Sequence, residues 1–125
     1  MYRLTVRDHI MIAHSLNSET FGPAKNLHGA TYIVDTEYAT KDLDKDNLVI
    51  DICLAQKALK EILSDLNYKN LDDHSELKSK ITTTEYMCKF IHEKLSRSVK
   101  SFFDGELKVT LHENHIAWAS FEDKV

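Results

Sequence analysis

The residues best suited to chemistry are two histidines at the ends of neighbouring strand-like segments. His14 ends an alternating run, and His28 opens the next one in the stretch KNLHGATY, residues 25–32. Side chains two positions apart on a strand share a face, so His28 and Ala30 point the same way. Imidazoles suit zinc, but a catalytic zinc site normally takes three protein ligands. Ala30 offers only a methyl group, so a third ligand must come from elsewhere in the chain.

Other interpretations of the histidines stay open. A histidine on the apolar face of a strand can be a core residue whose ring nitrogens are satisfied by hydrogen bonds. His74, in the acidic stretch LDDHSEL, can complete a metal site, replace a catalytic base, or be a solvated surface residue. The stretch HENH, residues 112–115, lacks the spacing of the metalloprotease motif HExxH and falls in a strand pattern.

The alternation of apolar and polar residues predicts which elements position these side chains. Residues 2–14 alternate with period two and predict a long half-buried strand. A second strand, rich in Tyr, Ile, Val and Thr, is predicted from about residue 27 to residue 39. Asp51 precedes an apolar pattern of helical spacing and is expected to be its N-cap. Thr82 and Glu85 have the spacing of a capping box at the start of a second helix.

Two further alternating segments follow the second helix. They run through Leu107, Val109 and Leu111 and, after a turn near Asn114, through HIAWASF. The predicted order is therefore β-β-α-α-β-β, an α+β fold in two layers, with a four-stranded antiparallel sheet and two helices on one face. So small a sheet leaves long edge strands open, and self-association into a ring would cover them.

Composition limits the classes of function to consider. The chain has 125 residues, a net charge of -4, three glycines and one proline, which is typical of one globular domain spanning residues 1–125. The negative charge argues against nucleic-acid binding, which usually needs a basic patch. No segment approaches the roughly 20 apolar residues of a membrane span. Cys53 and Cys88 lie in apolar helical patterns, so we expect buried free thiols and a cytoplasmic protein.

The order of elements, with AH ending the first strand and HG opening the second, resembles the 6-pyruvoyl-tetrahydropterin synthase family. This family includes the 6-carboxytetrahydropterin synthases and has the tunnelling fold. The matching segments span nearly the whole chain: IAHSL, LHGATY, LVIDI, TTTE and HEN. The family holds zinc with three histidines, one ending the first strand and two in an HGH. The resemblance places these ligands at His14, His28 and Ala30, so zinc is an expected cofactor of which two ligands match.

The resemblance also implies positions for the catalytic groups. The catalytic cysteine of the family falls on Ala24, and the aspartate and histidine of its LDH motif fall on Asn67 and Tyr68. An asparagine cannot accept a proton, and a tyrosine with a pKa of about 10 is a poor base at neutral pH. The usual proton-transfer groups are therefore missing, and we predict as catalytic residues Tyr68 with Lys69, as a pair that shuttles protons, and His74, as a replacement base.

The pterin-binding part of the family pattern is better matched. Glu113 resembles the family glutamate whose carboxylate pairs with two N–H donors of a 2-amino-4-oxo pyrimidine ring. Without the resemblance, Glu113 would be a solvated carboxylate beside a turn. Thr83 and Thr84, in the segment that resembles the family's PTSE, are expected to meet the polar edge of the same ring at a helix N-terminus.

Three functions fit these features. The first is a divergent synthase acting on the side chain of a reduced pterin such as 7,8-dihydroneopterin triphosphate. The second is a metal-independent lyase similar to dihydroneopterin aldolase, with Tyr68 and Lys69, or Lys25, moving protons. The third is a non-catalytic pterin-binding protein. The resemblance also predicts a homo-oligomer built from trimers, a hexamer, with the pterin pocket between subunits.

Overall fold

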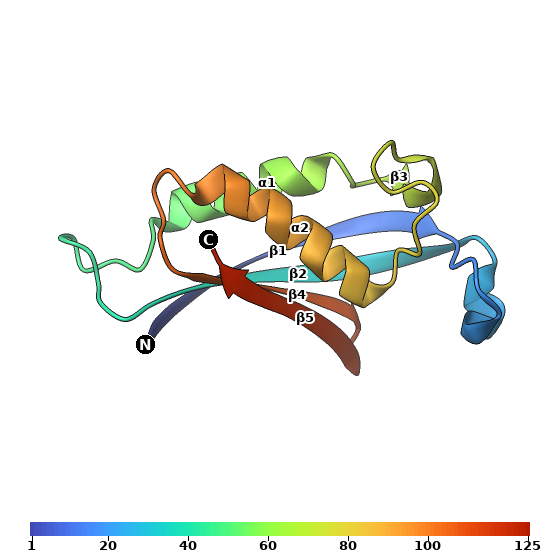
Figure 1. Cartoon of the computed structure of the whole chain (residues 1–125), viewed down its shortest axis with the longest axis horizontal. Helices are drawn as coiled ribbons and strands as arrows, with labels where there is room; N and C mark the ends of the chain where they lie inside the picture. The colour runs from blue at the N-terminus through green and yellow to red at the C-terminus, as the bar shows by residue number, and fades with distance from the viewer.

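The computed structural model describes all 125 residues and shows one sheet with two helices against one of its faces (Figure 1). The α+β class and the order of the long elements are confirmed. The elements in chain order are β1 (Tyr2–His14), η1 (Glu19–Lys25), β2 (His28–Thr40), α1 (Ile52–Ser64), β3 (Lys69–Asn70), η2 (Leu71–Asp73), α2 (Thr84–Val99), β4 (Glu106–Asn114) and β5 (Ala117–Lys124).

The sheet has five strands in the order β3-β1-β2-β4-β5, one more than predicted. The four long strands pair antiparallel, as the alternation implies. The pairing of β1 with β2 extends over their whole length and ends with His14 directly opposite His28. Two histidines that are separated by a loop in the sequence are therefore cross-strand neighbours.

The fifth strand, β3, has only two residues and pairs parallel with β1. The prediction of a purely antiparallel four-stranded sheet was incomplete because two residues carry no detectable alternation. The residues just before β3 hold it at the sheet edge. The Asn67 side chain accepts a hydrogen bond from the Met11 amide (3.0 Å), and the Tyr68 amide donates to the Met11 carbonyl (2.7 Å).

Both long helices begin at side-chain caps. The Asp51 carboxylate caps α1 as predicted and accepts hydrogen bonds from two amides of its first turn. α2 begins one residue later than the predicted capping box, because its N-cap is Thr83, whose hydroxyl accepts from the Tyr86 amide (3.2 Å). The hydroxyl of Thr82 is thereby left for another partner.

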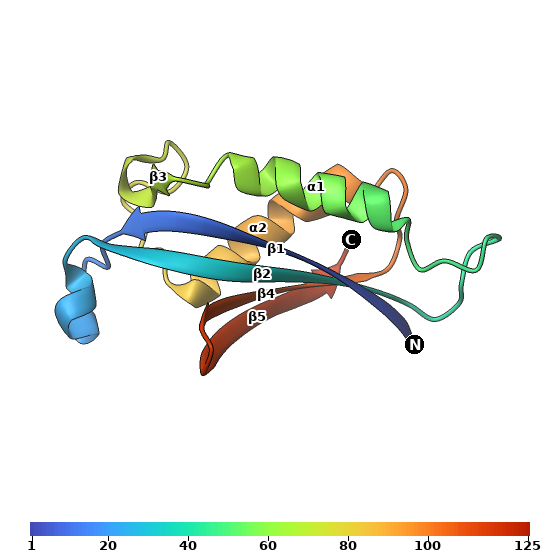
Figure 2. The same cartoon turned by 180° about the vertical axis from the view of Figure 1, so that it is seen from behind.

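The core lies between the helices and one face of the sheet, while the opposite face carries no helix (Figures 1 and 2). Cys88 is buried in α2, but Cys53 is exposed, contrary to the expectation of two buried thiols. Cys53 lies off the buried stripe of α1, which consists of Ala55, Ala58, Leu59 and Leu63. No helix of the protein is both long and apolar enough to cross a bilayer.

One end of the molecule gathers several segments of the chain around the two histidines. There β1 and β2 end beside η1, the segment with β3 and η2 lies over the end of β1, and α2 begins close by (Figure 1). The connection 41–50 projects from the opposite end. The sheet thus has one elaborated end, and the two histidines lie in it.

Candidate active site

His14 and His28 face each other across the ends of β1 and β2, with ring centroids 4.6 Å apart and planes at 62°. His14 is buried and His28 is half-buried. The Nδ1 of His14 lies 2.9 Å from the Thr82 hydroxyl, and the Nδ1 of His28 lies 2.8 Å from the Asn26 carbonyl. A carbonyl only accepts, so His28 carries a proton on Nδ1 and, as neutral imidazole, presents the lone pair of Nε2.

The environment of His14 keeps its ring neutral. Burial lowers the pKa of His14 because it disfavours the imidazolium form, and the neighbouring His28 lowers it further as a like charge. The carboxylates of Asp72 and Glu113 act in the opposite direction, so both acids lie within the electrostatic reach of the ring. A neutral imidazole of this kind can accept a hydrogen bond or bind a metal.

A second group of polar residues adjoins the histidines on the helix-covered side of the sheet. Tyr32 is buried, and burial raises the pKa of its phenol, whereas the nearby Thr84 side chain lowers it. The carboxylate of Glu113, at the end of β4, also raises the pKa of Tyr32 and therefore lies near the same ring. Glu113 itself is exposed and forms no ion pair. Residues from β2, β4 and the start of α2 thus converge beside His14.

Asp72 was not among the predicted site residues, yet it is the most firmly held acid at this end. Its carboxylate accepts hydrogen bonds from the amide (3.1 Å) and the hydroxyl (2.6 Å) of Ser15, which directly follows His14. The Asn70 side chain caps η2 and accepts from the Asp72 amide (3.0 Å). The backbone and the carboxylate of Asp72 are therefore both fixed next to the histidine pair.

Comparison with models of protein families shows to which family the chain belongs. The sequence model of the family described as "6-pyruvoyl tetrahydropterin synthase" matches residues 3–124, almost the entire chain. The chain belongs to the 6-pyruvoyl tetrahydropterin synthase family. The family predicted from the motifs is confirmed.

Individual relatives agree with the assignment to the 6-pyruvoyl tetrahydropterin synthase family. A Dictyostelium discoideum protein named 6-pyruvoyl tetrahydrobiopterin synthase is 32% identical over 101 residues, which cover 79% of this chain and 74% of that protein. The Caenorhabditis elegans 6-pyruvoyl tetrahydropterin synthase structure superposes with a TM-score of 0.85 at 23% identity, covering 98% of this chain and 95% of that one. At such low identity the structural likeness shows the fold alone.

Plasmodium vivax 6-pyruvoyl tetrahydropterin synthase is also similar in fold. It superposes with a TM-score of 0.81 at 16% identity, covering 99% of this chain and 98% of that one. A variant of the Plasmodium protein, in which a glutamate is replaced by alanine, is described as a catalytic residue mutant. In that relative the catalytic residue is a carboxylate.

The two imidazoles fit part of the zinc site that the synthase family implies. A ring Nδ1–H bonded to a carbonyl or hydroxyl is the usual support of a zinc-ligating histidine, and it leaves Nε2 for the metal. The third family position is Ala30, which lies on the same strand face as His28 and pairs with Ile12. No other side chain forms a group of three potential ligands with His14 and His28. One protomer thus supplies two of the three ligands that a catalytic zinc site normally takes.

Asn67 and Tyr68, the positions that the resemblance gives to the family's LDH motif, form no hydrogen bond with His14 or His28. Asn67 is used to hold the edge of the sheet, and the Tyr68 side chain is 80% exposed. The segment Leu71–Asp73 shares its first two residues with LDH and brings Asp72 beside Ser15. The segments 67–68 and 71–73 lie only a few residues apart. The tight turn at Tyr68 (φ 60°) between them could not be predicted from the sequence.

The three predicted catalytic residues are not part of the histidine site of one protomer. Tyr68, Lys69 and His74 form no hydrogen bond, ion pair or ring contact with His14 or His28. The Lys69 ammonium group lies 3.7 Å from a carboxylate oxygen at the end of α1. The exposed side chain of Tyr68 lies beyond the edge of β1.

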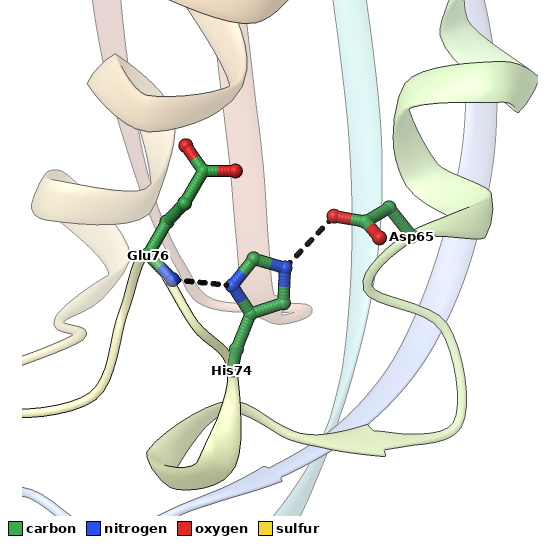
Figure 3. Close-up of side chains that lie close together, drawn as sticks. All are labelled: Asp65, His74 and Glu76. Atoms are coloured by element: carbon green, nitrogen blue, oxygen red, sulfur yellow. Dashed lines mark hydrogen bonds and ion pairs between the residues drawn. The ribbon is translucent and has the colours of Figure 1, made fainter.

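His74 belongs instead to a network that ties the loop after η2 to both helices, and Figure 3 shows its contacts with Asp65 and Glu76. Its Nε2 lies 2.8 Å from the Asp65 carboxylate at the end of α1, and its Nδ1 accepts a hydrogen bond from the Glu76 amide (3.2 Å). The Glu76 carboxylate is paired with Lys94 of α2 at 2.7 and 3.0 Å. His74 therefore positions the loop, and its side chain is only 7% exposed rather than solvated.

Asp65, His74 and Glu76 form the one group of three potential metal ligands whose ligand atoms lie within 4.8 Å of one another. Since an amide donates to Nδ1 of His74, the neutral ring carries its proton on Nε2 and donates it to Asp65. This hydrogen bond is the main cause of the lowered pKa of Asp65. Neither ring nitrogen has a lone pair to spare, so the cluster is a structural network.

Proposed function

We propose that this protein is an enzyme that acts on the side chain of a reduced pterin such as 7,8-dihydroneopterin triphosphate. The observation that supports this most strongly is the convergence, at one end of the sheet, of polar side chains from five different elements. They are His14 of β1, His28 of β2, Asp72 of η2, Thr84 of α2 and Glu113 of β4. A few polar groups that converge from distant segments are typical of a small-molecule site.

The pterin ring would be held by Glu113 and the start of α2. Because Glu113 is exposed and has no cationic partner, both carboxylate oxygens are available for two parallel N–H donors of the ring. Thr84 is half-buried and already directed at Tyr32, so it lines the same space. The hydroxyl of Thr83 caps α2, and its backbone amide and carbonyl are both hydrogen-bonded within the protein, so Thr84 is the better placed of the two threonines.

Asp72 is the group best placed to move a proton. Its carboxylate is fixed by Ser15 next to His14, and a carboxylate is a competent general base where its geometry is held. Tyr68, Lys69 and His74 remain predictions for the assembled protein, in which a neighbouring subunit would have to meet the exposed edge that carries Tyr68 and Lys69.

A second candidate function follows from Ala30. With only two histidine ligands in one protomer, a metal-independent lyase of the dihydroneopterin aldolase kind is the alternative chemistry. Turnover that survives exhaustive chelation would favour this lyase, and turnover that requires added zinc would favour the synthase reaction. A protein that binds pterin but turns over neither dihydroneopterin nor its triphosphate would be the non-catalytic relative.

The assembly is proposed to be a ring of trimers, a hexamer. β5 has no strand beyond it, and β3 covers only two residues of the outer edge of β1, so both sheet edges offer unpaired backbone groups. Such edges favour pairing with another chain. The two free cysteines suit a reducing compartment, which supports a cytoplasmic location. A monomer in light scattering at micromolar concentration would contradict the proposed ring.

The proposed pterin site is tested by calorimetric titration of Glu113 variants with neopterin at neutral pH. Leaving two ring donors unpaired in a desolvated site costs about 1–3 kcal/mol, so Glu113→Ala should weaken binding by about tenfold or more. Glu113→Gln should be milder because an amide offers a single acceptor. Glu122→Ala, which removes an exposed glutamate of β5, is the matched control and should bind like wild type. Unchanged binding by Glu113→Ala would refute the site.

A further inference from the structure

A pocket of about 390 Å³ lies at the end of the sheet opposite to the histidine pair, beside the connection 41–50 (Figure 1). His28 begins β2, whereas Thr40, which lines this pocket, ends it. The volume falls in the range of about 300–1,000 Å³ that is typical of small-molecule pockets. Its walls come mainly from the connection, the start of α1 and the loop between α2 and β4. None of the proposed active-site residues lines it, so the pocket is separate from that site.

Apolar side chains form more than half of the lining. Leu48, Leu54 and Phe102 are large lining residues that are between 41% and 44% exposed. The face of an aromatic ring attracts a cation, and no ammonium group of the protein lies over Phe102. Thr40 adds an acceptor, because its buried hydroxyl has no hydrogen-bond partner. The pocket thus offers apolar contact area to a ligand that also carries N–H donors.

The charged side chains of the lining are all negative. They are Asp42, Asp44, Asp46, Asp51 and Asp104, and no lysine, arginine or histidine lines the pocket. Asp42 and Asp46 are exposed, and their side chains form no hydrogen bond or ion pair. Asp44 and Asp51 each use one carboxylate oxygen for backbone amides and leave the other oxygen free. This charge is complementary to a cation and repels an anion.

The spacing of the aspartates favours an extended organic cation over a metal ion. A metal ion needs its ligand atoms close together, yet no three of these carboxylates place an oxygen within 4.8 Å of one another, as Asp65, His74 and Glu76 do with their ligand atoms. A chain of methylene groups that carries several separated charges can instead reach distant carboxylates. Its methylene groups then cover the apolar side chains between them, as the stem of a lysine does on a protein surface.

We propose that this pocket binds a linear aliphatic polyamine. Its ammonium groups pair with Asp42 and Asp46 and lie near the face of Phe102, while its methylene groups pack against Leu48 and Leu54. The inference does not rest on the proposed pterin function, because it uses no residue of that site. The protein would then carry a binding site for a cationic small molecule at the end of the sheet remote from the histidines.

The test is calorimetric titration of the full chain at low salt with spermidine, 1,4-diaminobutane and calcium chloride. Spermidine should bind most tightly, and the diamine should bind more tightly than calcium although both carry the same charge. The double variant Asp42→Asn/Asp46→Asn should weaken spermidine binding by about tenfold. Phe102→Leu keeps an apolar side chain but removes the aromatic face, and should weaken binding by about threefold. Added salt should weaken binding as well.

Asp73→Asn is the matched control, because Asp73 is an exposed and unpaired aspartate at the other end of the molecule. Equal losses per aspartate in Asp73→Asn and in the double variant would mean attraction by net charge alone and would overturn the site. Wild-type affinity of the double variant would overturn it too. Tighter binding of calcium than of the diamine would show an ion site, and tighter binding of a lysine-rich peptide than of spermidine would show a protein-docking surface; either result would refute the proposal. Neopterin binding should be the same in the double variant and in wild type, so the two sites are tested independently.

Discussion

His14 with His28, and His74 with Asp65 and Glu76, are two clusters of potential metal ligands at the same end of the fold. In the first cluster each ring uses only Nδ1 within the protein and keeps Nε2 for something else. In the second cluster both nitrogens of His74 are engaged. The second cluster places three ligand residues within 4.8 Å of one another and the first offers two, yet only the first has an unused imidazole lone pair.

The comparison teaches that proximity of ligand residues is a poorer guide to function than the hydrogen bonds already made by each ligand atom. A side chain whose polar atoms are all satisfied by its own protein gains little from a ligand that must first displace those bonds. The His74 network instead connects α1, α2 and the loop that follows Asp72. It holds that loop in place.

The largest expected effect comes from completing the first cluster. Ala30→His adds an imidazole on the same strand face as His28 and should raise zinc affinity by at least about 100-fold, because even a residue that only supports a ligand is worth about 10–100-fold. The measurement is zinc titration after dialysis against chelator. Thr31→His, which adds an imidazole to the opposite face of β2, is the matched control and should bind zinc like wild type.

Zinc that stays bound to the wild-type protein at one equivalent through dialysis would contradict this comparison. It would mean that a third ligand, from another subunit or from a rearranged loop, already completes the pair. Zinc bound at the second cluster would be revealed if Glu76→Gln lowered the zinc content while His28→Ala did not.

Removal of the ring of His74 should destabilise the fold without affecting zinc. His74→Ala loses the bond to Asp65 and the acceptor for the Glu76 amide, as well as the packing of the ring against Phe90, so the free energy of unfolding should fall by about 1–2 kcal/mol. Urea unfolding measures this loss. His115→Ala, at an exposed position in the last turn, should unfold like wild type. An unchanged unfolding midpoint for His74→Ala would show that the network contributes nothing.

A smaller effect is expected from removing the Thr82 hydroxyl, which supports His14 in the first cluster. Thr82→Val keeps the shape of the buried side chain but removes the hydroxyl that lies 2.9 Å from Nδ1 of His14. The free energy of unfolding should fall by about 1 kcal/mol, and the zinc affinity of the Ala30→His protein should fall with it, because the supporting bond is lost. Thr31→Val, at an exposed position, is the control for the substitution itself. Equal stability of the two variants would argue against a hydrogen bond between Thr82 and His14.

The smallest expected effect is a dependence on pH. Burial and His28 lower the pKa of His14, so the unfolded chain binds this proton at a higher pH than the folded one. Stability due to His14 is therefore complete above a pH of about 6.5 and is lost as the pH falls toward the lowered pKa. The midpoint of urea unfolding should drop between about pH 7.5 and about pH 5.5, and His14→Gln should show a smaller drop. Equal drops would assign the effect to other groups.

Much of the scaffold could be predicted from the sequence, because local periodicity carries it. Alternation over residues 2–14 matches β1 closely, and the aspartate before the first helical pattern is its cap. The strand face shared by His28 and Ala30 follows from the same periodicity, whereas the expectation of a zinc ligand at position 30 came from the resemblance to the family. These features depend on backbone geometry that neighbouring residues impose, so one sequence suffices to see them.

The partners of each polar atom were decided only in the tertiary structure. The start of α2 differs by one residue from the predicted capping box, and that shift turns Thr82 from a cap into a partner of His14. Asp72, and not Asn67 or Tyr68, is the residue whose side chain bonds to Ser15 beside the histidine pair. Hydrogen bonds between segments far apart in the chain depend on distances of a few tenths of an ångström, which no local pattern of residue types specifies.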